Sequence, residues 1–255
     1  MRILITRFGG VGDLFYIEPT IRALSDKYKT KDIVLRTYKD YENVLARHPC
    51  ISNVVLDDNR YRLGYFRNNT PNDDKDWSGV DPNFNLHFDF STGLGIVDDP
   101  AHIIDVFSSI AGLSLIDKKP RMFYKKVSVP KVKILAQLKS AGNGRDLSKN
   151  IKIRNVIESL PDSEFIGETP MSHDEFMSRI QECDIFIGTE SCGIIASYAM
   201  GKKTIGIYEH SGRIKNRSFD GMLHFTQRDM VDRIEDLVSG ISKLDLEIQE
   251  TIPQL

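Results

Sequence analysis

Hydrophobic positions along the first half of the chain alternate between two spacings. The apolar run RILITR (2–7) predicts a β-strand, and residues 13–27 that follow carry apolar side chains every three or four positions, as in an amphipathic helix. The same alternation continues, with strands predicted at 32–38, 51–58, 85–90 and 121–126 and helices at 41–49 and 101–112. Residues 59–82 lose this periodicity and predict a long surface loop.

A second alternating set follows Pro130. Strands are predicted at 132–138, 164–167, 184–189 and 203–208, and helices at 150–160, 172–183, 193–200 and 227–241. Strands that alternate with helices are typical of parallel sheets with crossover helices. The chain is therefore predicted to be an α/β protein with two Rossmann-like domains, residues 1–127 and 128–255. Ligands are expected at the carboxyl ends of the strands, in a cleft between the two halves.

The turn after the first strand is rich in glycine and ends in an acid. Gly9, Gly10 and Gly12 precede Asp13. A dinucleotide-binding turn would have a small residue at position 15, where this chain has Phe15. It would also have an acidic ribose ligand at the end of the second strand, where this chain has Arg36, so NAD or FAD binding is not favoured. Asp13 could cap the helix and complement its dipole, or it could be a functional residue at the edge of the sheet. The pattern alone leaves both interpretations open.

Residues 2–55, RILITRFGGVGDLFYIEPTIRALSDKYKTKDIVLRTYKDYENVLARHPCISNVV, resemble the amino-terminal half of the ADP-heptose:lipopolysaccharide heptosyltransferases, glycosyltransferase family 9. The shared features are the Gly12-Asp13 turn, a helix with a proline and RAL, and HP before the third strand; FNLHFDFSTGLG (84–95) continues the match. The resemblance implies GT-B architecture, two Rossmann-like domains facing a cleft. It also implies that Asp13 is the general base on the acceptor hydroxyl, and that the second domain binds the donor.

Residues 170–211 resemble the donor-binding signature of the same family. Glu190, Ser191 and Cys192 stand for its Asp, Ser/Thr and Gly, and Gly193 begins a helix whose free amides suit an anion, whereas Ile195 replaces its His. The alternative is that Glu190 and Ser191 only cap this helix. In the loop 138–150, where the family binds the donor diphosphate, the candidates are Ser140, Asn143 and Arg145.

Composition narrows the class of protein further. A net charge of −2, with 40% hydrophobic and 27% charged residues, gives no global attraction to nucleic acid or anionic membranes. Three cysteines, Cys50, Cys183 and Cys192, lack metal-ligand spacing and predict reduced thiols in the cytoplasm. No apolar segment suits a signal peptide or a membrane span, so stable membrane insertion is not expected.

The combined prediction is an inverting, metal-independent glycosyltransferase that needs no cofactor besides its co-substrate. Its partners would be a nucleotide-diphosphate sugar as donor and a saccharide of lipopolysaccharide type as acceptor. Asp74-x-Asp76 resembles the motif of metal-dependent transferases, but it lies in the polar loop rather than after a strand. Two alternatives stay open: a transferase acting on a hydroxylated base of nucleic acid, suggested by basic and aromatic residues at 60–67, and a non-catalytic sugar-nucleotide-binding protein.

Overall fold

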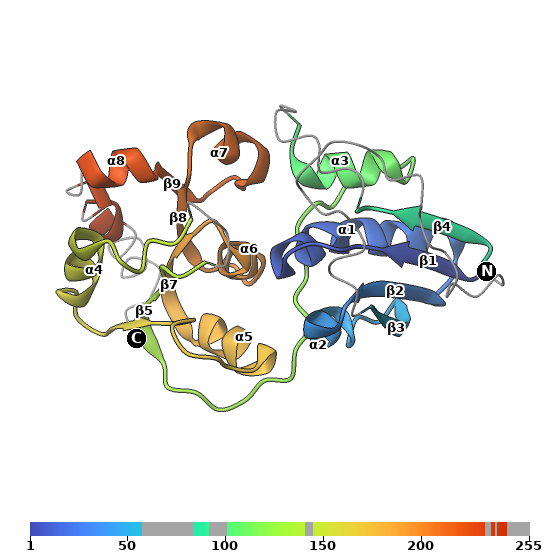
Figure 1. Ribbon diagram of the computed structural model, residues 1–255, viewed down its shortest axis with the longest axis horizontal. Helices are drawn as coiled ribbons and strands as arrows, with labels where there is room; N and C mark the ends of the chain where they lie inside the picture. The colour runs from blue at the N-terminus through green and yellow to red at the C-terminus, as the bar shows by residue number, and fades with distance from the viewer. Residues whose placement is uncertain (58–83, 92–100, 141–144, 233–235, 238, 244–255) are drawn as a thin grey trace, which may run out of the picture. The chain divides into compact units, whose positions relative to one another are not determined.

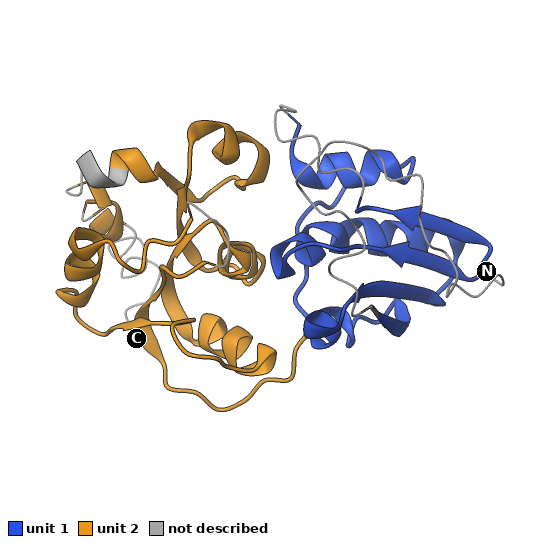
Figure 2. Ribbon diagram, viewed as in Figure 1, with its two compact units in different colours: residues 1–123 blue, residues 124–255 orange. Residues whose placement is uncertain are grey.

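The chain forms two compact units, residues 1–123 and 124–255 (Figure 2). The computed structural model (Figure 1) describes residues 1–57, 84–91, 101–140, 145–232, 236–237 and 239–243. The observed division falls four residues before the boundary at 127 expected from the sequence. The basic and aromatic stretch 60–67, Asp74 and Asp76 lie outside the described residues.

Unit 1 contains a parallel four-stranded sheet in the order β3-β2-β1-β4. Its strands are β1 (Ile3–Thr6), β2 (Ile33–Tyr38), β3 (Ile51–Asp57) and β4 (Leu86–Asp89). Its helices are α1 (Val11–Tyr28), the 3₁₀ turn η1 (Lys39–Tyr41), α2 (Glu42–Leu45) and α3 (Ile103–Ile110), and α1 packs against α3 (Figure 1). The chain order of the strands reverses between β1 and β4, where Thr6 pairs with Asp89. This switch point is where open parallel sheets bind ligands.

Unit 2 contains a parallel five-stranded sheet in the order β6-β5-β7-β8-β9. Its strands are β5 (Val132–Gln137), β6 (Ser163–Phe165), β7 (Cys183–Thr189), β8 (Lys203–Tyr208) and β9 (Leu223–Thr226). Its helices are α4 (Ile151–Glu158), α5 (His173–Glu182), α6 (Cys192–Ala199), α7 (Ser211–Arg217) and α8 (Gln227–Asp232). The switch point lies between β5 and β7, which end at Gln137 and Thr189.

The local sequence explains most of these elements. Central strands are covered on both faces by helices and read as continuous apolar runs, and Ile185, Phe186 and Ile187 are fully buried. Side-chain caps fix two helix starts, because Asn150 accepts a hydrogen bond from the amide of Ile153 at 3.2 Å and Ser172 does the same at the start of α5. The α/β class and the parallel sheets predicted from the sequence are confirmed.

The strand predicted at 121–126 is wrong. This segment runs as irregular chain, and its end is held by α5 rather than by a sheet. The amide of Lys125 donates to Asp174 at 3.0 Å, and the amide of Val127 donates to Ser178 at 3.0 Å. Two elements, α7 and β9, were not predicted, because 209–222 is polar and β9 has only four residues.

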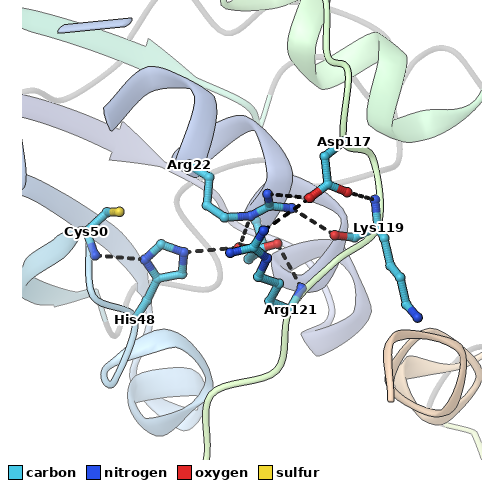
Figure 3. Close-up of polar contacts among 7 residues, drawn as sticks. Arg22, His48, Cys50, Asp117, Lys119 and Arg121 are labelled. Atoms are coloured by element: carbon cyan, nitrogen blue, oxygen red, sulfur yellow. Dashed lines mark hydrogen bonds and ion pairs between the residues drawn. The ribbon is translucent and has the colours of Figure 1, made fainter. Parts of the chain in front are cut away.

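A buried acid in α1 anchors the chain that leaves unit 1 (Figure 3). Glu18 is fully buried and accepts hydrogen bonds from Arg22 Nε at 2.7 Å and from the amide of Arg121 at 2.9 Å. His48 Nε2 lies 3.2 Å from the same carboxylate. Arg22 also donates to Asp117 at 2.9 Å. Residues 117–121 are thereby fixed against α1, close to the end of unit 1.

Candidate functional site

The carboxylate of Asp13 lies at the carboxyl end of β1 and is held from two sides. Asp13 is the third residue of α1, and its Oδ2 accepts a hydrogen bond from the amide of Gly10 at 2.7 Å. Its Oδ1 lies 3.1 Å from Nη2 of Arg7, and its side chain is 15% exposed. Both contacts stabilise a negative charge. Asp13 therefore does cap the start of α1, as one of the two interpretations of the sequence predicted, and part of its side chain is exposed at the carboxyl edge of the sheet.

Arg7, which no sequence motif indicated, is buried within unit 1 and forms an ion pair with Asp13. Its side chain is fully buried, Nη1 donates to the carbonyl of Phe90 at 2.6 Å, and the guanidinium lies 4.9 Å from the centre of the Phe107 ring. Nε of Arg7 has no hydrogen-bond partner in the described part of the chain. A buried charge is costly unless it is paired, so the arginine and Asp13 depend on each other.

The glycines of the turn have unequal roles. A Cβ on Gly9 would lie 2.5 Å from Oδ2 of Asp13, which is closer than Cβ atoms pack in proteins, and 3.1 Å from Nη2 of Arg7, which is a tight contact. A Cβ on Gly10 would lie 3.7 Å from the same carboxylate oxygen, an ordinary contact. Gly12 is the second residue of α1 and is half-buried. The absence of a side chain at Gly9 is what gives the ion pair its space.

Two neighbouring connections close this edge of unit 1. The amide of Phe8, after β1, donates to the hydroxyl of Ser91, after β4, at 2.9 Å. The amide of Ser91 donates in turn to Asp89 at 2.8 Å. The two loops that flank the switch point are thus bonded to each other, which fixes the backbone that carries Arg7 and Gly9.

In unit 2 the predicted residues Ser191 and Gly193 meet β5. The hydroxyl of Ser191 donates to Gln137 Oε1 at 2.7 Å. A Cβ on Gly193 would lie 2.2 Å from that oxygen and 2.5 Å from the Phe186 ring, so glycine allows α6 to begin close to the sheet. Ser191 is the N-cap residue of α6 but makes no side-chain capping hydrogen bond. Ser191 therefore does not cap α6 through its side chain, although it occupies the N-cap position.

Glu190 instead joins three arginines, and we call these four side chains the Glu190–arginine cluster. Glu190 Oε1 lies 3.3 Å from Nη1 of Arg213, 3.4 Å from Nε of Arg217 and 3.5 Å from Nη1 of Arg145. Arg145 follows β5 and is one of the predicted residues, and its carbonyl accepts a hydrogen bond from Thr189. Arg213 and Arg217 come from α7 and were not predicted. Their only signal in the sequence is a pair of arginines four residues apart, soon after a strand.

The neighbouring Tyr208, at the end of β8, is buried beside this cluster. Burial and the charge of Glu190 raise the pKa of the Tyr208 hydroxyl, while Arg217 opposes the shift. The hydroxyl therefore stays protonated at physiological pH and adds no negative charge. Oε2 of Glu190 has no hydrogen-bond partner among the described residues.

The other predicted donor residues are placed as follows. Ser140 is half-buried in the chain after β5, and Asn143 lies outside the described residues. Cys192 is the first residue of α6, where burial raises the pKa of its thiol to about 11. At neutral pH that thiol is protonated, so Cys192 is not a nucleophile.

Two kinds of feature are absent from the described part of the chain. Across these residues no three His, Cys, Asp or Glu side chains are gathered as metal ligands. The described helices include none with the length and apolar composition needed to cross a membrane.

The two units and their strand orders define a fold of the GT-B glycosyltransferase type. Among solved structures, the chain is similar to ADP-heptose lipopolysaccharide heptosyltransferase II of E. coli, with a TM-score of 0.65 and 12% identity over 98% of this chain and 100% of that one. It is also similar to a glycosyl transferase of family 9 from Veillonella parvula, with a TM-score of 0.63 and 12% identity over 93% of this chain and 89% of that one.

A third similar structure is heptosyltransferase WaaC of E. coli, with a TM-score of 0.62 and 8% identity over 94% of this chain and 99% of that one. The sequence matches no protein-family model and no curated protein. At these identities the similarity establishes the fold, and the resemblance to glycosyltransferase family 9 is confirmed at that level.

Proposed function

We propose that the chain is a glycosyltransferase that moves a sugar from a nucleotide-diphosphate sugar to a hydroxyl group of a saccharide acceptor. The observation that carries this proposal is the partly exposed Asp13 carboxylate, held by Arg7 and the Gly10 amide at the switch point of unit 1. It occurs in a chain with the fold of heptosyltransferases. The protein is proposed to act in the cytoplasm, because its three cysteines lack metal-ligand spacing and suit a reducing compartment.

The proposed reaction is a single displacement with inversion at the anomeric carbon. Asp13 accepts the proton of the acceptor hydroxyl as its oxygen forms a bond to that carbon. The bond from the carbon to the diphosphate oxygen breaks, and its electron pair stays on the departing nucleoside diphosphate. A carboxylate is a weak base for an alcohol, so the proton moves late, when the anomeric carbon is already cation-like. In this scheme no metal ion is required, because arginines balance the charge of the leaving group.

The second unit is proposed to hold the donor. WaaC, one of the similar structures, was solved with ADP and with ADP-2-deoxy-2-fluoro heptose, which shows that this fold accommodates nucleoside diphosphates in that protein. In the present chain Arg145 and Glu190 follow β5 and β7 at the carboxyl edge of the sheet of unit 2, and their side chains are in contact. Ser140, Ser191 and Gly193 lie in or beside the same connections, and Asn143 is proposed to complete the set from the same loop. The family's His is Ile195 here, so the proposal leaves the sugar open and does not extend to heptose.

A transfer assay with a panel of nucleotide-diphosphate sugars and saccharide acceptors tests the proposal. Asp13→Asn should keep donor affinity and lower turnover by about 10²- to 10⁴-fold, the range for loss of a general base. Asp105→Asn is the matched control, because Asp105 is an exposed acid of the same unit that pairs with Lys118. Full turnover in Asp13→Asn would contradict the assigned role. Donor binding without turnover for every acceptor would favour the alternative of a sugar-nucleotide-binding protein.

A further inference from the structure

The Glu190–arginine cluster has more positive charge than its internal acid can balance. Three guanidinium groups contact one carboxylate, so Glu190 by itself cannot balance their charge. The Glu190 side chain is 6% exposed, whereas the three arginines are 16% to 29% exposed. The acid therefore lies beneath the cluster, and the cations reach the surface of unit 2.

The hydrogen-bonding capacity of the cluster also exceeds what Glu190 can use. Each guanidinium carries five N–H donors in a planar fork, and all three arginines contact the single oxygen Oε1. Nε of Arg213 has no hydrogen-bond partner in the part of the chain that the structure describes. Planar forks of this kind match the oxygens of phosphate groups better than a lysine does.

The cluster is assembled from separate elements around the switch point. Arg145 comes from the chain between β5 and α4, Glu190 follows β7, and α7 supplies the other two arginines. Arg213 and Arg217 are four residues apart, which places them on one face of α7. Within the cluster the three cations repel one another, and an anion that contacts all three would offset this repulsion.

We propose that Arg213 and Arg217 of α7, together with Arg145, bind the diphosphate of the donor, and that Glu190 is the positioning residue that orients them. This inference rests on the proposed function, and it assigns the leaving group to two residues outside the motif that predicted the site. Three guanidiniums from two elements contact two phosphoryl groups at once, so the site selects diphosphates over monophosphates. As the glycosidic bond breaks, the electron pair gained by the diphosphate is stabilised by the same cations.

The test measures calorimetric binding of inorganic pyrophosphate, orthophosphate and ADP to the full chain. The wild type should bind pyrophosphate and ADP at least tenfold more tightly than orthophosphate. Arg213→Met and Arg217→Met should each weaken pyrophosphate binding at least tenfold, and Arg213→Lys should recover part of the loss. Arg179→Met is the matched control, because it removes an arginine of the same unit that pairs with Glu164, and its affinity should equal that of the wild type.

The melting temperature and circular dichroism of each variant show whether it is folded. If Arg213→Met does not fold, Arg213→Lys replaces it in the binding measurements. The inference is overturned if folded Arg213 and Arg217 variants bind pyrophosphate as the wild type does, if orthophosphate binds equally well, or if the wild type binds none of the three probes. Pyrophosphate binding that depends on these arginines, without transfer from any sugar nucleotide, contradicts only the proposed function. Transfer with an unchanged donor KM in both arginine variants contradicts only this inference.

Discussion

The guanidinium of Arg7 and the carboxylate of Asp13 form an ion pair in which only the acid reaches the surface. Nη2 of Arg7 lies 3.1 Å from Oδ1 of Asp13, the arginine is fully buried, and the aspartate is 15% exposed. The cation thus fixes the orientation of the carboxylate from within the unit. A negative charge on a glycine-rich turn would repel a phosphate, which fits the proposal that unit 1 serves the acceptor.

Replacing Arg7, the buried member of this pair, should destabilise unit 1. Arg7→Met leaves Asp13 without its cation and Phe90 without a donor, so we expect a loss of about 3 kcal/mol in the free energy of unfolding. Urea unfolding measures the loss. The exposed pair of Arg2 with Asp32 provides the control, and Arg2→Met should cost less than about 1 kcal/mol.

A double-mutant cycle separates the ion pair from the other contacts of Arg7. Combining Arg7→Met with Asp13→Asn should give a coupling energy of at least about 1 kcal/mol, because the two side chains are in direct contact. Strictly additive effects would show that the pair makes no net contribution and that Arg7 acts through Phe90 and Phe107 alone.

The two adjacent glycines of the turn give a sharper test of the geometry. Gly9→Ala places a methyl group 2.5 Å from the Asp13 carboxylate and must displace it, whereas Gly10→Ala makes only a 3.7 Å contact. If Asp13 is the base, Gly9→Ala should lower turnover by about 100-fold, since small misplacements of a catalytic group are costly. Gly10→Ala should stay within about threefold of the wild type. Equal turnover in the two variants would show that the position of Asp13 is not critical.

The features that could be predicted from the sequence are those set by local patterns. Buried parallel strands read as apolar runs whatever their neighbours, so 184–189 was identified as a strand without knowledge of β5 or β8. The turn ending at Asp13 was also local, because strand, glycines and helix follow one another directly. These elements carry the fold and the first candidate residue.

The features that could not be predicted depend on residues far apart in the sequence. The sequence of residues 121–126 resembles that of a strand, yet the amide of Lys125 donates a hydrogen bond to Asp174 of α5 and not to a neighbouring strand. Arg213 and Arg217 look like ordinary solvated cations until α7 brings them to Glu190. Arg7 reads as a polar residue at the end of a strand, and only the positions of Phe90 and Phe107 make it a buried cation.

The buried acid in α1 should matter more for stability than the exposed groups around it. Glu18→Gln removes the charge that Arg22 and His48 contact, and we expect it to cost about 3 kcal/mol in the free energy of unfolding. Arg121 binds Glu18 through its backbone amide while its side chain is exposed, so Arg121→Ala should change stability by less than about 0.5 kcal/mol. Urea titrations of both variants measure this contrast. Equal costs would show that the negative charge of Glu18 does not stabilise the unit.

Two of the cysteines should be unreactive in the folded protein. Burial raises the pKa of the Cys192 thiol to about 11 and that of Cys183 to about 12. At pH 8 roughly one Cys192 thiol in a thousand is ionised, and only the thiolate reacts quickly. Iodoacetamide labelling followed by mass spectrometry should modify neither residue at an appreciable rate, whereas the urea-unfolded chain should react at all three cysteines. Rapid labelling of Cys192 in the folded protein would show that its thiol is accessible and ionised.

The pH dependence of stability should reveal the half-buried histidine of β9, His224. His224 packs against the Tyr208 ring at 6.2 Å, and its Nδ1 has no hydrogen-bond partner in the described residues. Burial lowers the pKa of His224 below its usual value of 6.5, and the nearby Asp220 charge opposes this only in part. In the unfolded chain the residue therefore binds a proton at a higher pH than in the folded protein. Its contribution to stability is fully present above about pH 6.5 and is lost as the pH falls through the lower pKa of the folded state.

His224→Gln removes that proton linkage and leaves the acidic residues unchanged. Free energies of unfolding measured in urea between pH 7.5 and pH 5 should fall more steeply for the wild type than for the variant. The carboxylates contribute equally to both proteins, so the difference between the two curves isolates the histidine. Parallel curves would show that His224 gains its proton as easily in the folded protein as in the unfolded chain, and that burial at β9 does not favour its neutral form.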